Sequence, residues 1–183
     1  MAPLPEILPR AKRIRPHPAS LSSLVAAVML LASGEAADAG RTARDGLDRA
    51  AIEALVVEEA TRMGVPVSLA LAVAHAESSF DPNALSHKGA RGVMQIMPKT
   101  ALGEYGIGPE LLWNPRINVR LGLHFLKRLL WRYRGRTDLA LSYYNGGSAV
   151  GDLPHARVIP ATALYVERVE RLRRRYSGRL ARR

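Results

Sequence analysis

The segment Val67–Ala76 is almost wholly apolar, and it constrains the fold more than any other part of the sequence. A helix formed by these residues has almost no polar face, so other segments must cover it on every side. Pro66 and Ser68 mark its start. The run Asp-Pro-Asn at 81–83 is expected to end it, because proline cannot continue a helix. The sequence therefore predicts a central, buried helix.

The rest of the chain is dominated by further helical patterns. Polar and glycine residues from Ser86 to Gly92 suit a loop or a short β-ribbon. With 183 residues, the chain is long enough for one domain with a sizeable core. We expect a mostly α fold with one domain and a small loop or β-ribbon element. Helices are expected from Asp48 to Met63, from Lys99 after Pro98, from Asn114 or Asn118 to Arg134, from Thr137 to Gly146 and from Pro160 to Tyr176.

The first 39 residues have the pattern of a secretory signal peptide. Basic residues from Arg10 to Arg15 precede an unbroken nonpolar run, Leu24–Ala32, and small residues end at Ala37-Asp38-Ala39. A retained membrane anchor is the alternative, but this run is well short of the ~20 residues that span a bilayer. We therefore expect export to the periplasm and no transmembrane span in the mature protein. Residues 40–47 are expected to be a linker, 48–170 the domain and 171–183 a basic C-terminal tail.

The net charge favours an anionic partner. The chain has 27 Lys and Arg against 16 Asp and Glu, a net charge of +11. Residues 1–39 hold four basic and three acidic residues, so the remainder keeps 23 against 13, a net charge of +10. An anionic polymer or surface would be attracted to such a protein. The sequence has no cysteine, which excludes disulfides and lipid acylation of a cysteine.

Glu77 is the first candidate for chemistry, because it ends the apolar helix. Desolvation there would raise its pKa, so that it could hold a proton near neutral pH. Ser78 follows it directly and could orient the carboxyl. The alternative is a glutamate at a frayed helix end that faces water, and spacing alone does not separate the two.

Two further segments place polar groups in apolar surroundings. Gln95 lies in the run Val-Met-Gln-Ile-Met, where a ligand or the backbone must satisfy its amide. Tyr143 and Tyr144 precede Asn145 at a double glycine, which is either part of a site or an ordinary helix stop. If Gln95 contacts a ligand, Gln95→Ala should lower activity and leave the thermal midpoint nearly unchanged.

Together these segments resemble the soluble lytic transglycosylase family, whose catalytic domain shares the goose-type lysozyme fold. The resemblance extends from Pro66 to about Arg171 and includes "AESSFDPNA", "GARGVMQIMP", "NPRINVRLGLHFLKRLL", "LALSYYNGG" and "IPATALYVERV". The Glu-Ser pair, the Met-Gln run and the Tyr-Asn pair are jointly specific. Two departures are small: Gly146 stands where alanine is usual, and Tyr143 where alanine is frequent.

The resemblance implies a peptidoglycan lytic transglycosylase, which cleaves the β-1,4 bond between N-acetylmuramic acid and N-acetylglucosamine and leaves 1,6-anhydromuramyl ends. Glu77 matches the single catalytic acid and base of such enzymes. The matching substrate-binding positions are Ser78, Met94, Gln95, Tyr144, Asn145 and Tyr165, with Met94 and Gln95 lining the glycan cleft. The implied partner is the peptidoglycan glycan strand, and a cell-envelope secretion or appendage complex is a further candidate.

Three other functions compete with this interpretation. A lysozyme-type hydrolase would need a second carboxylate, for which Asp81 is the candidate, although Asp-Pro-Asn is also a turn signal. A non-catalytic glycan-binding module or a nucleic-acid-binding protein could use the basic tail as an anchor, but export argues against nucleic acid. The histidines are too scattered for a metal site and the motifs of zinc enzymes are missing, so we expect neither a metal nor a cofactor.

Overall fold

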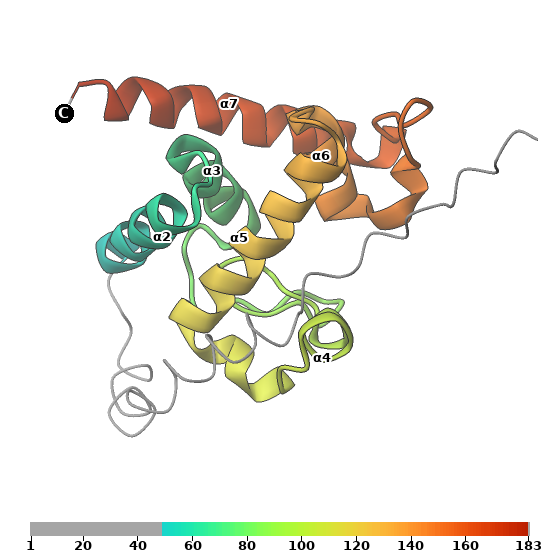
Figure 1. Cartoon of the computed structure of the whole chain (residues 1–183). Helices are drawn as coiled ribbons and strands as arrows, with labels where there is room; N and C mark the ends of the chain where they lie inside the picture. Colours follow the sequence, from blue (N-terminus) through green and yellow to red (C-terminus); the bar gives the residue numbers. More distant parts are fainter. Residues whose placement is uncertain (1–48, 183) are drawn as a thin grey trace, which may run out of the picture.

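The apolar segment that was predicted to lie at the centre forms helix α3 (Val67–Ser78), with every residue from Leu69 to Ala74 buried. The computed structural model describes residues 49–182. Helix α3 packs between α2 (Arg49–Met63) and α7 (Ala163–Leu180), and α7 lies across it in Figure 1. The prediction of a central, buried helix is therefore confirmed.

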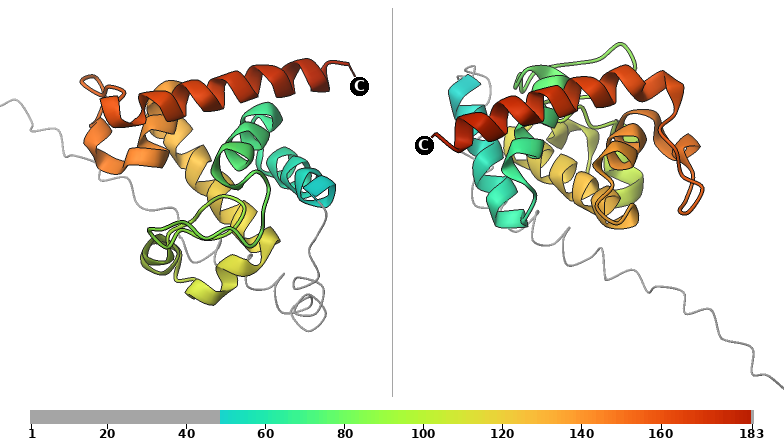
Figure 2. Two further views of the ribbon diagram at one scale, coloured as in Figure 1. Left: turned by 180° about the vertical axis from the view of Figure 1, so that it is seen from behind. Right: turned by 90° about the horizontal axis from the view of Figure 1, so that it is seen from above.

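The remaining helices complete a mostly α domain, as the sequence predicted. Helix α5 packs against α2 and α6, and α6 in turn packs against α7. The two views of Figure 2 show the long loop that follows α3 beside α5. These elements are α4 (Pro98–Tyr105), α5 (Pro115–Arg132) and α6 (Thr137–Gly146), with the short 3-10 helices η1 (Pro109–Trp113), η2 (Gly147–Val150) and η3 (Pro160–Thr162).

Helix α3 ends earlier than the Asp-Pro-Asn run at 81–83 suggested. Ser79 and Phe80 both adopt the left-handed backbone region, with φ of 55° and 70°. This conformation is costly for a residue with a side chain, but it places the Phe80 ring in the core, against the rings of His75 and Tyr176. The chain therefore turns immediately after Ser78, and Glu77 lies in the last turn of the helix.

The segment that was expected to form a loop or β-ribbon is a loop with two isolated bridges. Arg91 pairs with Leu85 and with Ile96, and no strand forms within residues 49–182. Asn114, not Asn118, caps α5, because its Oδ1 accepts hydrogen bonds from the backbone N–H groups of Arg116 and Ile117.

Helix α7 continues into the region that was expected to be a basic tail. It runs to Leu180, and Leu172 and Tyr176 lie in the core. Arg179 also forms an ion pair with Glu53 of α2 at 2.8 Å. Residues 171–180 are therefore part of the packed domain rather than an appendage to it. None of the helices between residues 49 and 182 has the length and apolar character needed to cross a bilayer.

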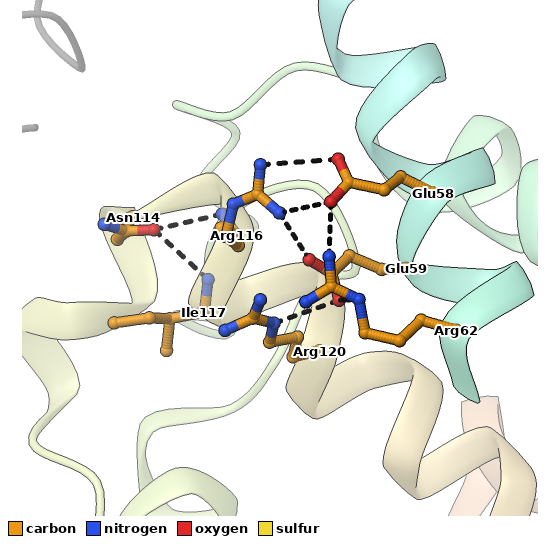
Figure 3. A network of polar contacts seen from close by, with 7 residues as sticks. All are labelled: Glu58, Glu59, Arg62, Asn114, Arg116, Ile117 and Arg120. Carbon is orange, nitrogen blue, oxygen red and sulfur yellow. Dashed lines mark hydrogen bonds and ion pairs between the residues drawn. The ribbon is translucent and has the colours of Figure 1, made fainter. Parts of the chain in front are cut away.

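A buried ion-pair network fixes α5 against α2 (Figure 3). The side chain of Glu59 is 0% exposed, and its two oxygens accept hydrogen bonds from Arg116 at 2.6 Å and from Arg120 at 3.0 Å. Arg116 also contacts Glu58, which pairs with Arg62. The network sits beside the capped start of α5, so it sets the position of the helix that carries Asn118.

We predict that Glu59→Ala lowers the free energy of unfolding by about 3 kcal/mol. The change leaves Arg120, only 11% exposed, without its partner, and an unpaired buried charge is costly. Glu104→Ala is the matched control, because it removes an exposed pair with Arg128 and should cost at most about 1 kcal/mol. Urea unfolding measures both variants. Equal, small losses would contradict a structural role for the network.

Candidate active site

Glu77 and Tyr165 form the centre of the site, and they come from opposite ends of the domain. The Tyr165 hydroxyl, in the first turn of α7, donates a hydrogen bond to Glu77 Oε1 at 2.5 Å. Both side chains are partly buried where α7 crosses α3. One carboxyl oxygen of Glu77 is therefore held by the protein, while Oε2 accepts no hydrogen bond from the residues at 49–182.

Burial raises the pKa of Glu77 to about 7. The hydrogen bond from Tyr165 and the positive charge of Arg168 act in the opposite direction, and burial outweighs them. Within residues 49–182, no carboxylate is among the groups that shift this pKa. A carboxyl with a pKa near 7 can both donate and accept a proton at neutral pH.

Tyr144 lies close to the same carboxyl. Its pKa is raised well above the usual value, first by burial and then by the charge of Glu77. Its hydroxyl donates a hydrogen bond to the backbone carbonyl of Met94 at 2.9 Å. Tyr144 thus joins α6 to the loop that follows α3 and helps to enclose Glu77.

Ser78, at the end of α3, bonds to the same loop one residue before Met94. Its hydroxyl donates to the carbonyl of Val93 at 2.8 Å and has a longer contact with the carbonyl of Ala74. Its one proton is thus engaged by the backbone. This contact gives Ser78 a positioning role, but it acts on the loop backbone and not, as expected, on the carboxyl of Glu77.

The side chain of Met94 is fully buried and lies in the core. It packs so tightly on α5 that a Cβ atom at Gly122 would come within 2.5 Å of the Met94 Cβ. The expectation that this side chain lines a glycan cleft is therefore not supported by its position. Met94 contributes to the site through its backbone, because its carbonyl accepts the hydrogen bond from Tyr144.

Gln95 is held by the backbone, in the left-handed region with a φ of 48°. Its side-chain amide donates to the carbonyl of Gly92 at 3.0 Å and to that of Ala84 at 3.1 Å. Its oxygen Oε1 accepts no hydrogen bond from the described residues. Gln95 thus braces the loop with its amide nitrogen and has its carbonyl available for a ligand.

Asn145 differs from the other expected site residues, since it is exposed at the end of α6. It follows Tyr144 directly in the chain. Its side chain forms no hydrogen bond with any residue between 49 and 182. Both its amide nitrogen and its oxygen are thus available to a ligand.

Two residues of the site were not found by reasoning from the sequence. Asn118 is fully buried: it accepts a hydrogen bond from the backbone N–H of Met94 and donates to the carbonyls of Arg91 and Leu112. Arg168 lies one turn after Tyr165 on α7 and acts on Glu77 through its charge. The spacing of three residues between Tyr165 and Arg168 places both on one side of a helix, so the sequence contained a signal for Arg168. For Asn118 it contained none, because this residue is equally consistent with a helix cap.

The site has no cluster of metal-ligand side chains. In the part of the chain that the structure describes, no three His, Asp or Glu side chains come together in a group suited to a metal ion. The residues gathered around Glu77 are instead two tyrosines, an arginine and backbone carbonyls. Such a set supports proton transfer and hydrogen bonding.

The raised pKa of Glu77 makes stability depend on pH. The folded protein binds this proton more tightly than the unfolded chain, so wild-type stability should fall as the pH rises from 4.5 through about 7. The glutamine of Glu77→Gln does not titrate. The free energy of unfolding of this variant should therefore rise relative to that of the wild type over this pH range, by up to about 3 kcal/mol. Urea unfolding of both proteins at several pH values measures the difference. A difference that stays constant with pH would contradict a raised pKa.

The contacts of Gln95 change the expectation for Gln95→Ala. The variant loses two hydrogen bonds and keeps a side chain in the left-handed region, so it should lose about 2 kcal/mol of stability as well as activity. Asn145→Ala is the control, with an expected change below about 0.5 kcal/mol because the residue is exposed. An unchanged urea midpoint for Gln95→Ala would show that the amide does not brace the loop.

Comparison with known proteins agrees with the resemblance noted in the sequence. The chain is 35% identical over 109 residues to membrane-bound lytic murein transglycosylase C of Glaesserella parasuis, matching 51% of this chain and 30% of that protein. It is 31% identical over 90 residues to the soluble lytic murein transglycosylase of Escherichia coli, of which it covers 14%. The chain thus spans less than a third of the length of these relatives.

A solved structure shows the same fold. The lytic transglycosylase Slt of Pseudomonas aeruginosa, determined as an inactive glutamate-to-glutamine mutant, superimposes with a TM-score of 0.61 at 28% identity. The match covers 70% of this chain and 24% of that one. The family model of the transglycosylase SLT domain matches residues 54–152, more than half of the sequence, and the chain therefore belongs to the transglycosylase SLT domain family.

Proposed function

We propose that this protein is a peptidoglycan lytic transglycosylase with Glu77 as its only catalytic carboxyl. The observation that carries the proposal is the state of Glu77: its pKa is raised to about 7, it is held by Tyr165, and no second carboxylate among residues 49–182 shifts its pKa. A glycosidase that adds water works with a pair of carboxyl groups. A lytic transglycosylase uses one group as acid and then as base. The named relatives, all murein transglycosylases, support the same reaction.

The proposed reaction moves one proton through Glu77 twice. Protonated Glu77 first donates to the glycosidic oxygen, so that the bond to the anomeric carbon of N-acetylmuramic acid breaks as positive charge grows on the ring. The carboxylate then accepts the proton of the C6 hydroxyl, whose oxygen bonds to the anomeric carbon and closes the 1,6-anhydro ring. Glu77 ends the cycle protonated, and no water is added.

The hydrogen bond from Tyr165 supports this assignment of roles. It engages Oε1 and leaves Oε2 as the oxygen that carries the reactive proton. Since an O–H donor stabilises the carboxylate, Tyr165 also keeps the pKa from rising further above neutrality. A group that must both give and take a proton near neutral pH benefits from that balance.

The other expected site residues have different proposed roles. Gln95 Oε1 and the Asn145 amide are proposed to bind sugar hydroxyl or acetamide groups, because neither is satisfied within residues 49–182. Tyr144 and Ser78 are proposed to position the loop around the carboxyl, since their hydroxyl groups already bond to Met94 and Val93.

The hydrolase alternative would require Asp81, and its contacts do not favour a catalytic role. Asp81 is exposed, and its Oδ1 accepts a hydrogen bond from the backbone N–H of Asn83 at 2.8 Å. This is the bond of an Asx turn, which explains the residue without chemistry.

We further propose that the protein acts in the periplasm. The signal peptide predicted at residues 1–39 and the linker at 40–47 lie outside the described residues, so this proposal rests on their sequence pattern. The positive charge suits an anionic cell wall. A secretion or appendage complex as partner stays a prediction from the resemblance.

Glu77→Gln should abolish cleavage while the protein still folds and binds glycan. The amide can neither donate nor accept the proton, so the rate should fall by at least ~10⁴-fold, the upper range for general acid–base groups. Asp81→Asn is the control and should keep most of the activity. Mass spectrometry of digested peptidoglycan should show 1,6-anhydromuramyl ends for wild type and Asp81→Asn. Reducing ends with one added water, together with an inactive Asp81→Asn, would identify a hydrolase instead.

A further inference from the structure

Helix α7 carries a row of arginines on its outward side. Arg168, Arg171 and Arg175 are all exposed and follow one another at spacings of three and four residues, which places them on one side of the helix. At ~1.5 Å per residue the row extends for about 10 Å along the axis. The apolar side of α7, with Val169, Leu172 and Tyr176, faces the core.

The arginines of this row lack ion-pair partners in the part of the chain that the structure describes. None of the three arginines forms an ion pair with any residue from 49 to 182, whereas Arg173 and Arg179 of the same helix pair with Glu170 and Glu53. Like charges three and four residues apart destabilise a helix. Three exposed arginines without ion-pair partners within residues 49–182 are suited to an anionic ligand.

The row begins beside the candidate active site. Arg168 acts on Glu77 through its charge, and Tyr165, one turn earlier, holds the carboxyl. Burial lowers the pKa of His75, and the charges of Arg49, Arg168 and Arg175 lower it further. Tyr165 bonds to Glu77, and Tyr176, near the other end of α7, bonds to His75 at 2.8 Å, so α7 crosses the last turns of α3 and the row leads away from the carboxyl. Figure 2, right, shows α7 passing over α3.

We propose that Arg168, Arg171 and Arg175 bind carboxylates of the peptide stems that branch from the muramic acid of peptidoglycan. This inference rests on the proposed function, because it places the stem of a strand bound at Glu77 along α7. An anionic membrane surface is the competing ligand. A helix that lies in a membrane interface buries its apolar face in the lipid, but the apolar face of α7 is already buried in the core. The row also starts one turn after Tyr165, which holds the carboxyl, as a surface for a substituent of the substrate should.

The test compares R171Q/R175Q with R134Q/R157Q, both in the full chain with Glu77→Gln to prevent cleavage. Arg134 and Arg157 are exposed, lie outside α7 and form no ion pair among the described residues, so the control removes the same charge. Fluorescence anisotropy measures binding to labelled glycan strands with intact peptides and to strands from which an amidase has removed the peptides. Vesicles that contain phosphatidylglycerol serve as the lipid probe.

R171Q/R175Q should weaken binding to peptide-bearing strands about fivefold, the combined effect of two exposed charge pairs, and should reduce its salt dependence. Binding to bare strands should not change, and the control variant should match its parent on both. The proposal would be overturned if R171Q/R175Q lost equal affinity for peptide-bearing and bare strands, or if the control variant lost as much affinity as R171Q/R175Q. It would also be overturned if R171Q/R175Q lost affinity for the vesicles alone. Because binding is measured without cleavage, these outcomes are independent of whether the wild type forms anhydro ends.

Discussion

The side chain of Asn118 is the contact on which the arrangement of the site depends. Fully buried on α5, it bonds to the backbone of Met94, Arg91 and Leu112 and so fixes the loop after α3 to the centre of the domain. A Cβ atom at Gly92 would lie 2.5 Å from its Nδ2, so the loop has no room to move closer. A buried amide with both ends satisfied specifies one loop position, where an apolar side chain would allow several.

The effect of this contact reaches Glu77 through two backbone carbonyls. Val93 and Met94 are presented by the loop to Ser78 and Tyr144, whose hydroxyl groups bond to them. Tyr144 then contributes to the surroundings that keep the carboxyl partly desolvated. The loop has no regular strand, so its shape depends on these side-chain bonds to the backbone and on the two isolated bridges.

The features that were predictable from the sequence are those that depend on local pattern. The apolar run of α3 and the spacing of apolar residues in α5 indicated helices, and the position of Glu77 at the end of such a run made a perturbed carboxyl one of two alternatives. What the sequence could not reveal depends on contacts between distant residues. Asn118 looks like a helix cap until the loop is seen to bond to it, and Met94 looks like a cleft residue until α5 is seen to pack against it at Gly122. The basic end of the chain was interpreted as a tail because its many arginines obscure the helical spacing of Leu172 and Tyr176, which are buried.

The bond between Tyr165 and Glu77 joins residues that are 88 positions apart in the chain. Contacts of such sequence separation are slow to form, because the entropy of closing a long loop must be overcome first. Glu77 is therefore without the group that holds it until α7 has packed against α3. The centre is complete only when the last helix has docked across α3, so the order of assembly itself delays the proposed activity until the whole domain has folded.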